Sequence, residues 1–403
     1  MNFYDLLKAQ AQIFGEKTFL QVDSRTFSYK NFFYAVESSE HCKNFFERGE
    51  QFRQADTSRR DNCSAAFKAA NFFYVGKFFS QAVNFFAAQK NNPSEVFSVA
   101  TSGSTSAPKI LQRTFASWND FFPTQNQIFR VDATSRLFMH GDLNFTGNLN
   151  TFLAVLSAGG SIVTTDKFAP KTWLELIKTA TNIYLVPTKL TLLAKGAPLD
   201  NIRAIFTGSQ VLTEAQSLAL MKKFPAAEIF LYYGASELSF VTYKKISAEN
   251  AAEIQNLGKN FDKVKIFIRN GLIFVDTPYR AIGIENPATV GDAGFINAHG
   301  DLIFLGRGED FINRGGVKIF ASAVEQKLLA IDGVEAVAVV KIGDKVRGEN
   351  FLAYIVGKID KKIIRQALLP AELPREIIFV PSLSLNKSGK VDKKLLLEEF
   401  SCR

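Results

Sequence analysis

Short apolar runs alternate with helical patterns through the middle of this chain of 403 residues, and this alternation limits its fold more than any other feature. The runs Ile183–Val186, Ala204–Phe206 and Ile229–Tyr232 have the length and composition of buried strands. Between the last two, Thr213 and Gln216 form a capping-box pattern, which marks the start of a helix. Strands and helices in this order predict an α/β fold, with a large, mostly parallel sheet that carries helices on both faces.

Polar loops that contain glycine follow the strands of this predicted sheet. They are Thr101–Lys109, Thr207–Gln210 and Tyr233–Glu237. The carboxyl ends of parallel strands meet at one edge of a sheet, and open α/β sheets bind their ligands beyond that edge. We therefore expect the three loops to contribute to one binding site.

The sequence pattern changes after Lys263. Short strands and turns predict a β-rich subdomain, and the glycine-rich stretch Gly306–Gly316 follows it. Val324 and Leu328 then lie at helical spacing, and two further strands complete a small α+β domain. We predict a large N-terminal domain over 1–308 and a C-terminal domain over 309–403. The strand-like runs outside the parallel sheet are Thr18–Val22 and Arg25–Tyr29, which form a hairpin pattern, and Ile266–Ile268, Leu272–Val275, Leu302–Leu305, Val334–Val340 and Phe351–Val356.

The composition is that of a globular protein. Hydrophobic residues make up 47% of the chain and charged residues 22%, which excludes disorder and coiled coil as descriptions of the whole chain. Phenylalanine is unusually common, with 39 copies, and we expect most of these rings in the core. No apolar run approaches the roughly 18 residues of a membrane span, and the start of the chain lacks the pattern of a signal peptide.

The cysteines indicate where in the cell the protein is expected, and the net charge indicates which kinds of partner it could bind. Cys42, Cys63 and Cys402 form no C-x-x-C pair, so we expect no disulfide framework and no zinc site, and a cytoplasmic location is the simplest. The net charge of +9 suits anionic small molecules or acidic partners, but a solvated basic surface is the simpler interpretation because the chain has no long run of like charges. Nucleic acid is not an expected partner, because no recognised binding motif accompanies the charge.

The loop Thr101–Lys109 has the composition of an anion-binding loop. Its small residues allow backbone N–H groups and hydroxyls to close around an anion, and Lys109 adds a positive charge. It is not a Walker A loop, because Pro108 precedes the lysine and Ile110 follows it. A solvated linker would have a similar composition, so the loop alone does not decide its role.

The same loop resembles the phosphate loop of the adenylate-forming (ANL) superfamily, which includes acyl- and aryl-CoA synthetases, adenylation domains of peptide synthetases and firefly luciferases. Four further motifs of that superfamily follow in its usual order. The segment Ile312–Lys318 most resembles stand-alone aryl-acid adenylating enzymes, and the short overall length resembles compact bacterial members such as o-succinylbenzoate–CoA ligase. The four motifs are Tyr233–Glu237, Gly291–Gly294, Gly306–Ile319 and Asn386–Lys390.

This resemblance implies an enzyme with a two-step reaction. A carboxylate attacks the α-phosphorus of ATP to give an acyl-adenylate and pyrophosphate, and a thiol then displaces AMP to give a thioester. The implied substrate is a small carboxylic acid, either an aryl acid or a medium acyl chain. The implied cofactors are ATP, Mg²⁺ and either CoA or the phosphopantetheine of an acyl carrier protein, and the choice between these two acceptors stays open.

The roles of the family's phosphate-binding residues are transferred to the positions that match its motifs. By resemblance, Thr105 and Lys109 would contact the β- and γ-phosphates, and Ser236 would lie near the α-phosphate. Glu237 would bind Mg²⁺, because a hard oxygen ligand suits a metal shared with phosphates. The residues expected to bind nucleotide or cofactor are Thr101, Ser102, Gly103, Ser104, Gly208, Ser209, Gln210, Tyr233, Gly234, Ser236, Asp292, Arg307 and Gly316.

The resemblance assigns further roles in the carboxyl-terminal half. Asp292 would accept hydrogen bonds from the ribose hydroxyls, and Arg307 would assist it. Lys390 would bridge the substrate carboxylate and the α-phosphate during adenylation. Glu309 would be the hinge about which the small domain swings between the two steps, and Gly316 would then line the tunnel for the pantetheine arm.

The chain also departs from the family. Ser106 stands where the family usually has glycine, and Glu309 stands where aspartate or lysine is commoner. We expect the substrate pocket to be lined by Asn144, Gly147, Tyr232 and Ala235, with Asn144 at a position that is often histidine. Few residues precede the phosphate loop, so we expect the large domain to be shortened at its start. This shortening motivates a different class of function, an inactive relative that only binds nucleotide.

Overall fold

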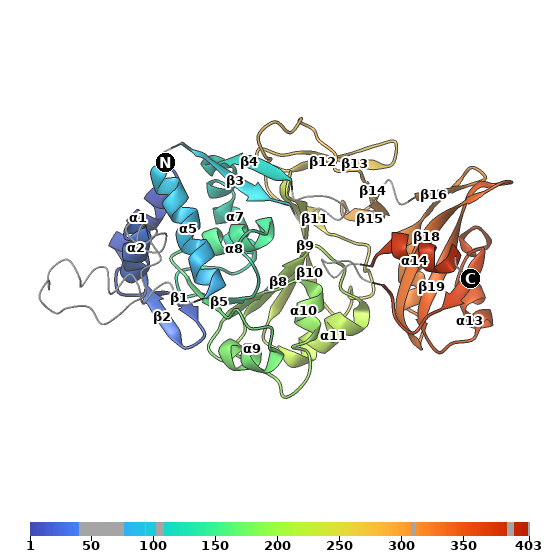
Figure 1. Cartoon of the computed structure of the whole chain (residues 1–403), viewed down its shortest axis with the longest axis horizontal. Coiled ribbons are helices and arrows are strands. Elements are labelled where there is room, and N and C mark those ends of the chain that lie inside the picture. Colours follow the sequence, from blue (N-terminus) through green and yellow to red (C-terminus); the bar gives the residue numbers. More distant parts are fainter. Residues whose placement is uncertain (40–75, 93, 102–108, 308–310, 385–390, 402–403) are drawn as a thin grey trace, which may run out of the picture. The chain divides into compact units, whose positions relative to one another are not determined.

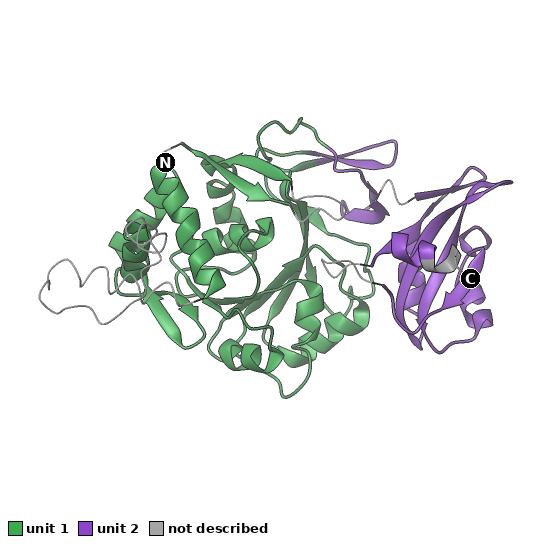
Figure 2. Ribbon diagram, in the orientation of Figure 1, with its two compact units in different colours: residues 1–103, 107–265, 276–288 green, residues 104–106, 266–275, 289–403 purple. Residues whose placement is uncertain are grey.

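The computed structural model describes residues 1–39, 76–92, 94–101, 109–307, 311–384 and 391–401. The chain divides into two compact units (Figure 2), the first made of 1–103, 107–265 and 276–288, and the second of 104–106, 266–275 and 289–403. The predicted boundary between 308 and 309 stays a prediction, because residues 308–310 lie outside the described part of the chain. The three cysteines also lie outside it.

A nine-stranded sheet forms the centre of unit 1, in the order β11-β10-β9-β8-β7-β5-β6-β1-β2. Neighbouring strands from β9 to β1 run parallel, whereas β2, β10 and β11 add antiparallel edges. The predicted parallel sheet and the predicted hairpin are therefore confirmed. The strands are β1 Thr18–Val22, β2 Arg25–Ser28, β5 Arg136–Met139, β6 Ser161–Thr164, β7 Asn182–Tyr184, β8 Ala204–Gly208, β9 Glu228–Ala235, β10 Ser239–Ile246 and β11 Lys259–Asn260.

One predicted strand ends earlier than its apolar run. The run continues to Val186, but β7 ends at Tyr184, where its pairing with β8 also ends. The reason is Pro187, which opens the next helix and leaves no N–H for a sheet.

Helices cover both faces of the sheet. Connections between parallel strands are right-handed, so the direction of a connection decides which face its helix covers. The chain moves toward β1 through α8 and toward β9 through α9, α10 and α11. Therefore α8 lies on one face of the sheet and the other three helices lie on the opposite face (Figure 1). The predicted capping box is present at the start of α11, with both the Thr213 and the Gln216 bonds. These helices are α8 Thr146–Ser157, α9 Pro170–Ile177, α10 Pro187–Thr191 and α11 Glu214–Lys223.

Aromatic rings fill the core of the N-terminal part of unit 1, as the phenylalanine content predicts. Phe3 and Phe115 lie with their ring centroids 4.8 Å apart, and Phe19 and Phe32 lie 5.1 Å apart. The strands on either side of the loop at 101–109, β3 and β4, form a separate two-stranded antiparallel sheet, so the prediction that this loop follows a strand of the large parallel sheet is wrong. The elements here are α1 Phe3–Phe14, α2 Tyr29–Glu37, α5 Lys77–Asn91, β3 Val96–Ala100, β4 Ile110–Thr114, α6 Phe115–Asn119 and α7 Phe122–Ile128.

Unit 2 contains most of a four-stranded antiparallel sheet and a five-stranded sheet that belongs to an α+β fold. The strand-like runs predicted between Ile266 and Val356 all lie in these sheets. The elements are β12 Lys265–Arg269, β13 Leu272–Asp276, β14 Asp292–Ile296, β15 Leu302–Arg307, β16 Phe311–Arg314, β17 Val317–Phe320, α12 Ala321–Leu329, β18 Val334–Asp344, β19 Gly348–Gly357, α13 Lys361–Gln366, a 3-10 turn Pro370–Glu372, β20 Glu376–Phe379 and α14 Lys393–Ser401.

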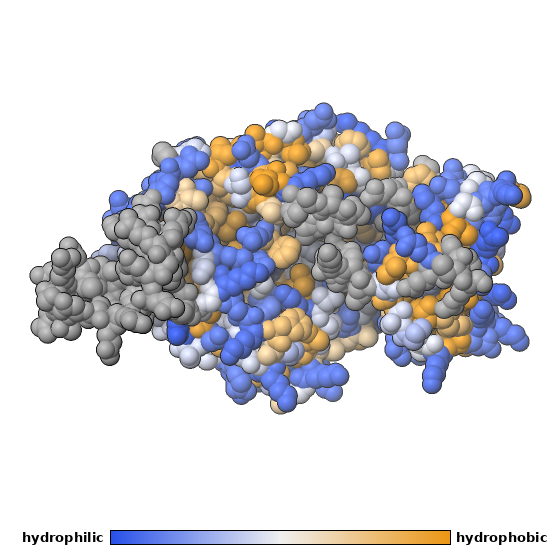
Figure 3. Space-filling view, viewed as in Figure 1, coloured by the Kyte–Doolittle hydropathy of each residue, from blue (hydrophilic) through white to orange (hydrophobic). Residues whose placement is uncertain are grey.

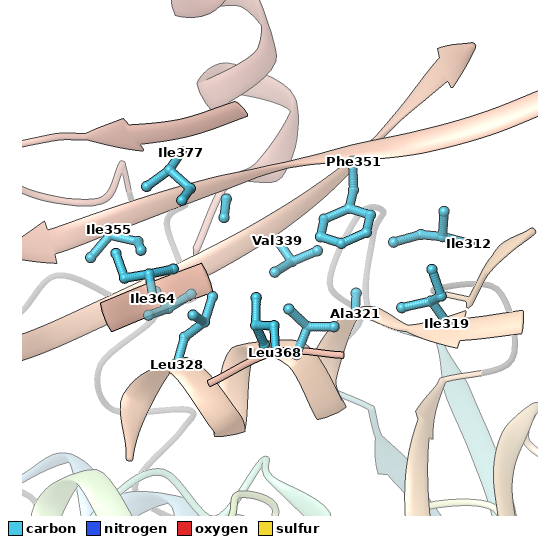
Figure 4. Close-up of a cluster of buried hydrophobic side chains, with 13 residues drawn as sticks. Ile312, Ile319, Ala321, Leu328, Val339, Phe351, Ile355, Ile364, Leu368 and Ile377 are labelled. Carbon is cyan, nitrogen blue, oxygen red and sulfur yellow. The ribbon is translucent and has the colours of Figure 1, made fainter. Parts of the chain in front are cut away.

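The five-stranded sheet buries both of its faces. Alternate side chains of β18 and β19, among them Val339 and Phe351, pack with Leu328 of α12 in one cluster (Figure 4). The residues between them, such as Val340 and Leu352, pack in a second cluster with Leu396 of α14. Because successive side chains of a strand point to opposite faces, a continuous apolar run here supplies two cores.

The surface agrees with a globular composition. Hydrophilic residues cover much of the face drawn in Figure 3, with apolar residues scattered among them. Within the described ranges, no helix combines the length and the hydropathy needed to cross a bilayer.

Candidate active site

The strand order of unit 1 places a topological switch point between β5 and β7. From β5 the chain passes to β6 on one side and then to β7 on the other, so the loops after β5 and β7 leave the sheet in opposite directions. Ligands of open α/β sheets bind in the crevice beyond the strands at such a point. The segment Asn144–Gly147 follows β5, and Tyr184 ends β7.

The loop predicted to bind phosphate is closed at its base by strands. Ala100 of β3 pairs with Ile110 of β4, and the Thr101 N–H donates to the Lys109 carbonyl at 2.9 Å. Lys109 is exposed at the start of β4. The antiparallel pair thus holds the two ends of the loop together, while Ser102, Gly103, Ser104 and Thr105 lie outside the described residues.

Ser236 and Glu237 are displayed by a tight turn between β9 and β10. The Leu238 N–H donates to the Ala235 carbonyl at 3.1 Å, so these two residues occupy the centre of the turn. Gly234 is required beside it, because a Cβ there would lie 2.4 Å from the Ser239 carbonyl oxygen. The turn follows the carboxyl end of β9, at the edge of the sheet where the switch point lies.

Hydrogen bonds join this turn to the base of the phosphate loop. Ser236 Oγ donates to Thr146 Oγ1 at 3.0 Å, and Thr146 Oγ1 donates to the Ala100 carbonyl at 3.0 Å. Phe145 also forms a parallel bridge with Ala100. The structure therefore joins two segments that the sequence predicts to be functional, 144–147 and 233–237, to Ala100, which directly precedes the loop 101–109. Thr146, which makes both bonds, lies within the pocket segment predicted from the sequence, but the sequence assigns it no role of its own.

The segment Gly208–Gln210 lies against Tyr232. A Cβ on Gly208 would come within 2.5 Å of the Tyr232 ring, so only glycine fits. Ser209 adopts a left-handed conformation with φ 69°, and it is exposed together with Gln210. This segment and β9 are adjacent because β8 and β9 are paired up to Gly208 and Tyr232.

Two buried tyrosines meet at the switch point. Tyr184 Oη lies 3.0 Å from Tyr232 Oη, and both side chains are buried. Burial raises the pKa of both hydroxyls, which therefore stay protonated at neutral pH. Of the pair, the sequence predicts only Tyr232 as a site residue, because Tyr184 lies within an apolar strand and carries no motif.

The tyrosine pair leaves no room for a side chain at position 147, which is glycine in this chain. A Cβ at Gly147 would lie 2.4 Å from Tyr184 Oη. Alanine normally stabilises a helix more than glycine does. Here the clash should outweigh that gain, and we expect Gly147→Ala to lower the free energy of unfolding by about 1–3 kcal/mol, the usual cost of overpacking a core. In Gly147→Ala/Tyr184→Phe the clashing hydroxyl is gone, and the closest remaining atom of that ring is the one at the position of Tyr184 Cζ, 3.7 Å from the Cβ.

Urea unfolding of the two single variants and the double variant tests this prediction. The double variant should lose less free energy of unfolding than the two single variants lose together, because Tyr184→Phe removes the hydroxyl that clashes with the new Cβ. Simple addition of the two losses would contradict the packing described here.

In unit 2, Asp292 and Arg307 are directly opposite each other on β14 and β15. Arg307 Nε lies 3.0 Å from Asp292 Oδ1, with the side chain of Asp292 4% exposed and that of Arg307 56% exposed. The pair predicted to bind ribose is therefore a cross-strand ion pair whose arginine end faces solvent. Glu309 and Lys390 lie outside the described residues.

Gly316 lies in the two-residue turn between β16 and β17. Gly315 and Gly316 have φ values of 60° and 90°, and Arg314 pairs with Val317 across them. Positive φ at both central positions is the requirement of a type I′ hairpin, which explains the Gly-Gly sequence. Gly316 is exposed, and no atom lies within 4 Å of the place its Cβ would take.

The chemistry of the donor set fits a magnesium ion held mainly by a nucleotide. Among the residues that the structure describes, no group of three or more His, Cys, Asp or Glu side chains could hold a metal alone. Mg²⁺ needs only one or two protein carboxylates when phosphates supply other ligands. Glu237, half-buried in its turn, is a carboxylate of this kind.

Comparison with known proteins agrees with this arrangement. The family described as AMP-binding enzyme matches residues 50–272, more than half of the chain. The chain belongs to the AMP-binding enzyme family. The C-terminal domain of AMP-binding enzymes also matches, over residues 323–390. The predicted resemblance is confirmed by these matches.

Relatives of this AMP-binding enzyme include ligases with different acceptors. An uncharacterised acyl–CoA ligase of Bacillus subtilis is 31% identical over 328 residues, which cover 74% of this chain and 68% of the relative. A 3,4-dihydroxybenzoate–[aryl-carrier protein] ligase of Bacillus anthracis is 26% identical over 310 residues, covering 73% and 72%. Among solved structures, o-succinylbenzoate CoA synthetase of Bacillus subtilis with its acyl-adenylate intermediate has a TM-score of 0.76 at 20% identity, with 97% of each chain covered. The fold class predicted from the sequence is thereby confirmed.

Proposed function

We propose that this AMP-binding enzyme is an acid–thiol ligase, which activates a small carboxylic acid with ATP and transfers the acyl group to CoA. The observation that carries the proposal is the hydrogen-bonded connection from Ala100 through Thr146 to Ser236. It joins the base of a phosphate-type loop to the turn that displays Glu237, at the switch point of a parallel sheet. Such a site would place an anion-binding loop and a metal-binding carboxylate around one nucleotide.

In the first step, a carboxylate oxygen of the acid attacks the α-phosphorus of ATP and the bond to the β-phosphate breaks. The products are an acyl-adenylate and pyrophosphate. Both reactants are anions, so the protein must supply positive charge and alignment. Lys109 would neutralise the phosphates that leave, and Lys390 is proposed to bridge the two reacting groups.

Glu237 would hold Mg²⁺, which supplies charge neutralisation to the phosphates when it is bound. Ser236 would lie near the α-phosphate, and its hydroxyl would have to exchange its bond to Thr146 for one to the nucleotide. Tyr233, with Gly208–Gln210, would bind the adenine, and the Asp292–Arg307 pair would bind the ribose.

In the second step, a thiol attacks the acyl carbon and AMP leaves with its phosphate. We propose CoA as the acceptor, with carrier-protein phosphopantetheine as the alternative that the likeness to an aryl-carrier-protein ligase supports. The acid is proposed to be an aryl acid or a medium acyl chain, bound near Asn144, Gly147, Tyr232 and Ala235. A cytoplasmic location stays a prediction from the sequence.

The test is pyrophosphate release from Mg·ATP with a panel of aryl, short, medium and long-chain acids. Each acid is assayed with CoA, with a phosphopantetheinylated carrier protein and without an acceptor. Release that depends on the acid is expected, and the acceptor that raises turnover identifies the second substrate. Silence with every acid, in protein shown to bind ATP, would contradict the proposal and favour an inactive nucleotide-binding relative.

A further inference from the structure

Arg113 is a buried arginine on β4, four residues after Lys109, and its side chain has no measurable solvent exposure. Among the described residues, no carboxylate forms an ion pair with it. The guanidinium instead donates to two main-chain carbonyls, from Nη1 to Tyr279 at 2.7 Å and from Nη2 to Ser236 at 2.5 Å. It also lies over the Trp118 ring, 5.2 Å from the ring centroid.

The two carbonyls belong to segments that enclose the Ser236–Glu237 turn. The Ala281 N–H donates to the Glu237 carbonyl at 2.7 Å, and the Ile282 N–H donates to the Gln112 carbonyl at 2.8 Å. The segment 279–282 therefore lies between β4 and the turn, and it bonds to both. Arg113, on β4, donates to this segment and to the turn. Hydrogen bonds therefore connect β4, the segment 279–282 and the Ser236–Glu237 turn to one another.

The charge of Arg113 is costly in this position. Burial lowers the pKa of the guanidinium to about 10, while the nearby negative charge of Glu237 acts in the opposite direction. The side chain is therefore cationic at neutral pH. A buried cation without a carboxylate partner adds little net stability compared with an apolar residue of similar volume, so packing alone does not account for an arginine here.

We propose that Arg113 is a positioning residue for the nucleotide site. It fixes the distance between the strand that leaves the phosphate loop and the turn that displays Glu237, and so places the Glu237 carboxylate for Mg²⁺ bound to ATP. This inference rests on the proposed function. It adds a residue whose effect is on the metal dependence of nucleotide binding rather than on contact with the nucleotide.

The experiment compares the full-length wild-type protein with Arg113→Met and Arg113→Lys. Binding of α,β-methylene-ATP is measured by calorimetry over a series of Mg²⁺ concentrations and in EDTA. Methionine removes both donors, so the Ser236 turn loses its direct bond to β4 while its other hydrogen bonds remain. The Mg²⁺ concentration at half-maximal effect should rise about tenfold, the scale of one charge-assisted hydrogen bond. Affinity in EDTA should stay close to that of the wild type.

Arg203→Met is the matched control. Arg203 forms hydrogen bonds to Asn182 and Asp132 at 3.2 and 2.8 Å, and it lies just before β8, at the end of the sheet opposite the switch point. Its loss should lower stability while leaving the Mg²⁺ midpoint within about twofold of the wild type, because effects of distant sites are independent.

Two results would overturn the role of Arg113. One is an unchanged Mg²⁺ midpoint in Arg113→Met, and the other is an equal loss of affinity in EDTA, which would assign Arg113 to the fold of the whole site. If the methionine variant does not fold, Arg113→Lys decides by the same criteria, since lysine keeps the charge but lacks the two-pronged geometry. Failure of the wild type to bind the analogue at any Mg²⁺ concentration would instead contradict the proposed function, and Arg113 with it.

Discussion

Replacement of Lys390 by alanine is expected to slow acid-dependent pyrophosphate release by about 10²–10³-fold, the usual cost of removing one group that stabilises transition-state charge. In the proposed reaction Lys390 bridges the attacking carboxylate and the α-phosphate, so its charge matters most while the new bond forms. Thioester formation from supplied acyl-adenylate should remain close to the wild-type rate, because that bond already exists. The measurement is the rate of each half-reaction alone.

Lys394→Ala is the matched control for this prediction. Lys394 lies on α14 in the same lysine-rich stretch and is exposed. Its replacement changes the net charge by the same amount and should leave both half-reactions unchanged. A comparable loss in Lys394→Ala would show that general surface charge, not the position of Lys390, is responsible.

Replacement of Gly316 by leucine is expected to have the opposite effect. Its Cβ would enter open space at an exposed turn, which is where the proposed tunnel for the pantetheine arm would lie. The side chain should obstruct the thiol and slow thioester formation by about 10²-fold, the scale of a small misplacement of reacting groups. Adenylation should be largely preserved. Single-turnover transfer from supplied acyl-adenylate to CoA measures the loss.

Backbone strain must be separated from obstruction in this variant. A residue other than glycine at φ 90° costs about 1–2 kcal/mol. Gly300→Leu carries the same strain at φ 80°, also in open space, in the turn between β14 and β15. It should leave thioester formation unchanged. If Lys390→Ala and Gly316→Leu both lost only the first half-reaction, the proposed swing of the C-terminal domain would be wrong.

Local patterns were sufficient to predict several elements of this protein, among them the strands with the clearest apolar runs and the start of α11. Strands such as β8 and β9 are buried on both sides and appear as continuous apolar runs, while the Thr213–Gln216 cap marks the start of α11. These signals depend on residues close together in the chain, and so they can be seen without a structure. The turn containing Gly315 and Gly316 follows the same rule, because positive φ selects glycine locally.

The sequence by itself also determined the family and the order of its motifs, since each motif is a short, continuous segment. Tertiary structure alone decided which side chains connect those segments. Tyr184 and Arg113 carry no motif, and the motif segment that contains Thr146 assigns that residue no role. Each of the three bonds to a residue at least 48 positions away. Such contacts arise only when the parallel sheet brings the ends of distant strands to one edge. The physical reason is that secondary structure follows local periodicity, whereas a site is built from hydrogen bonds and packing between segments far apart in sequence.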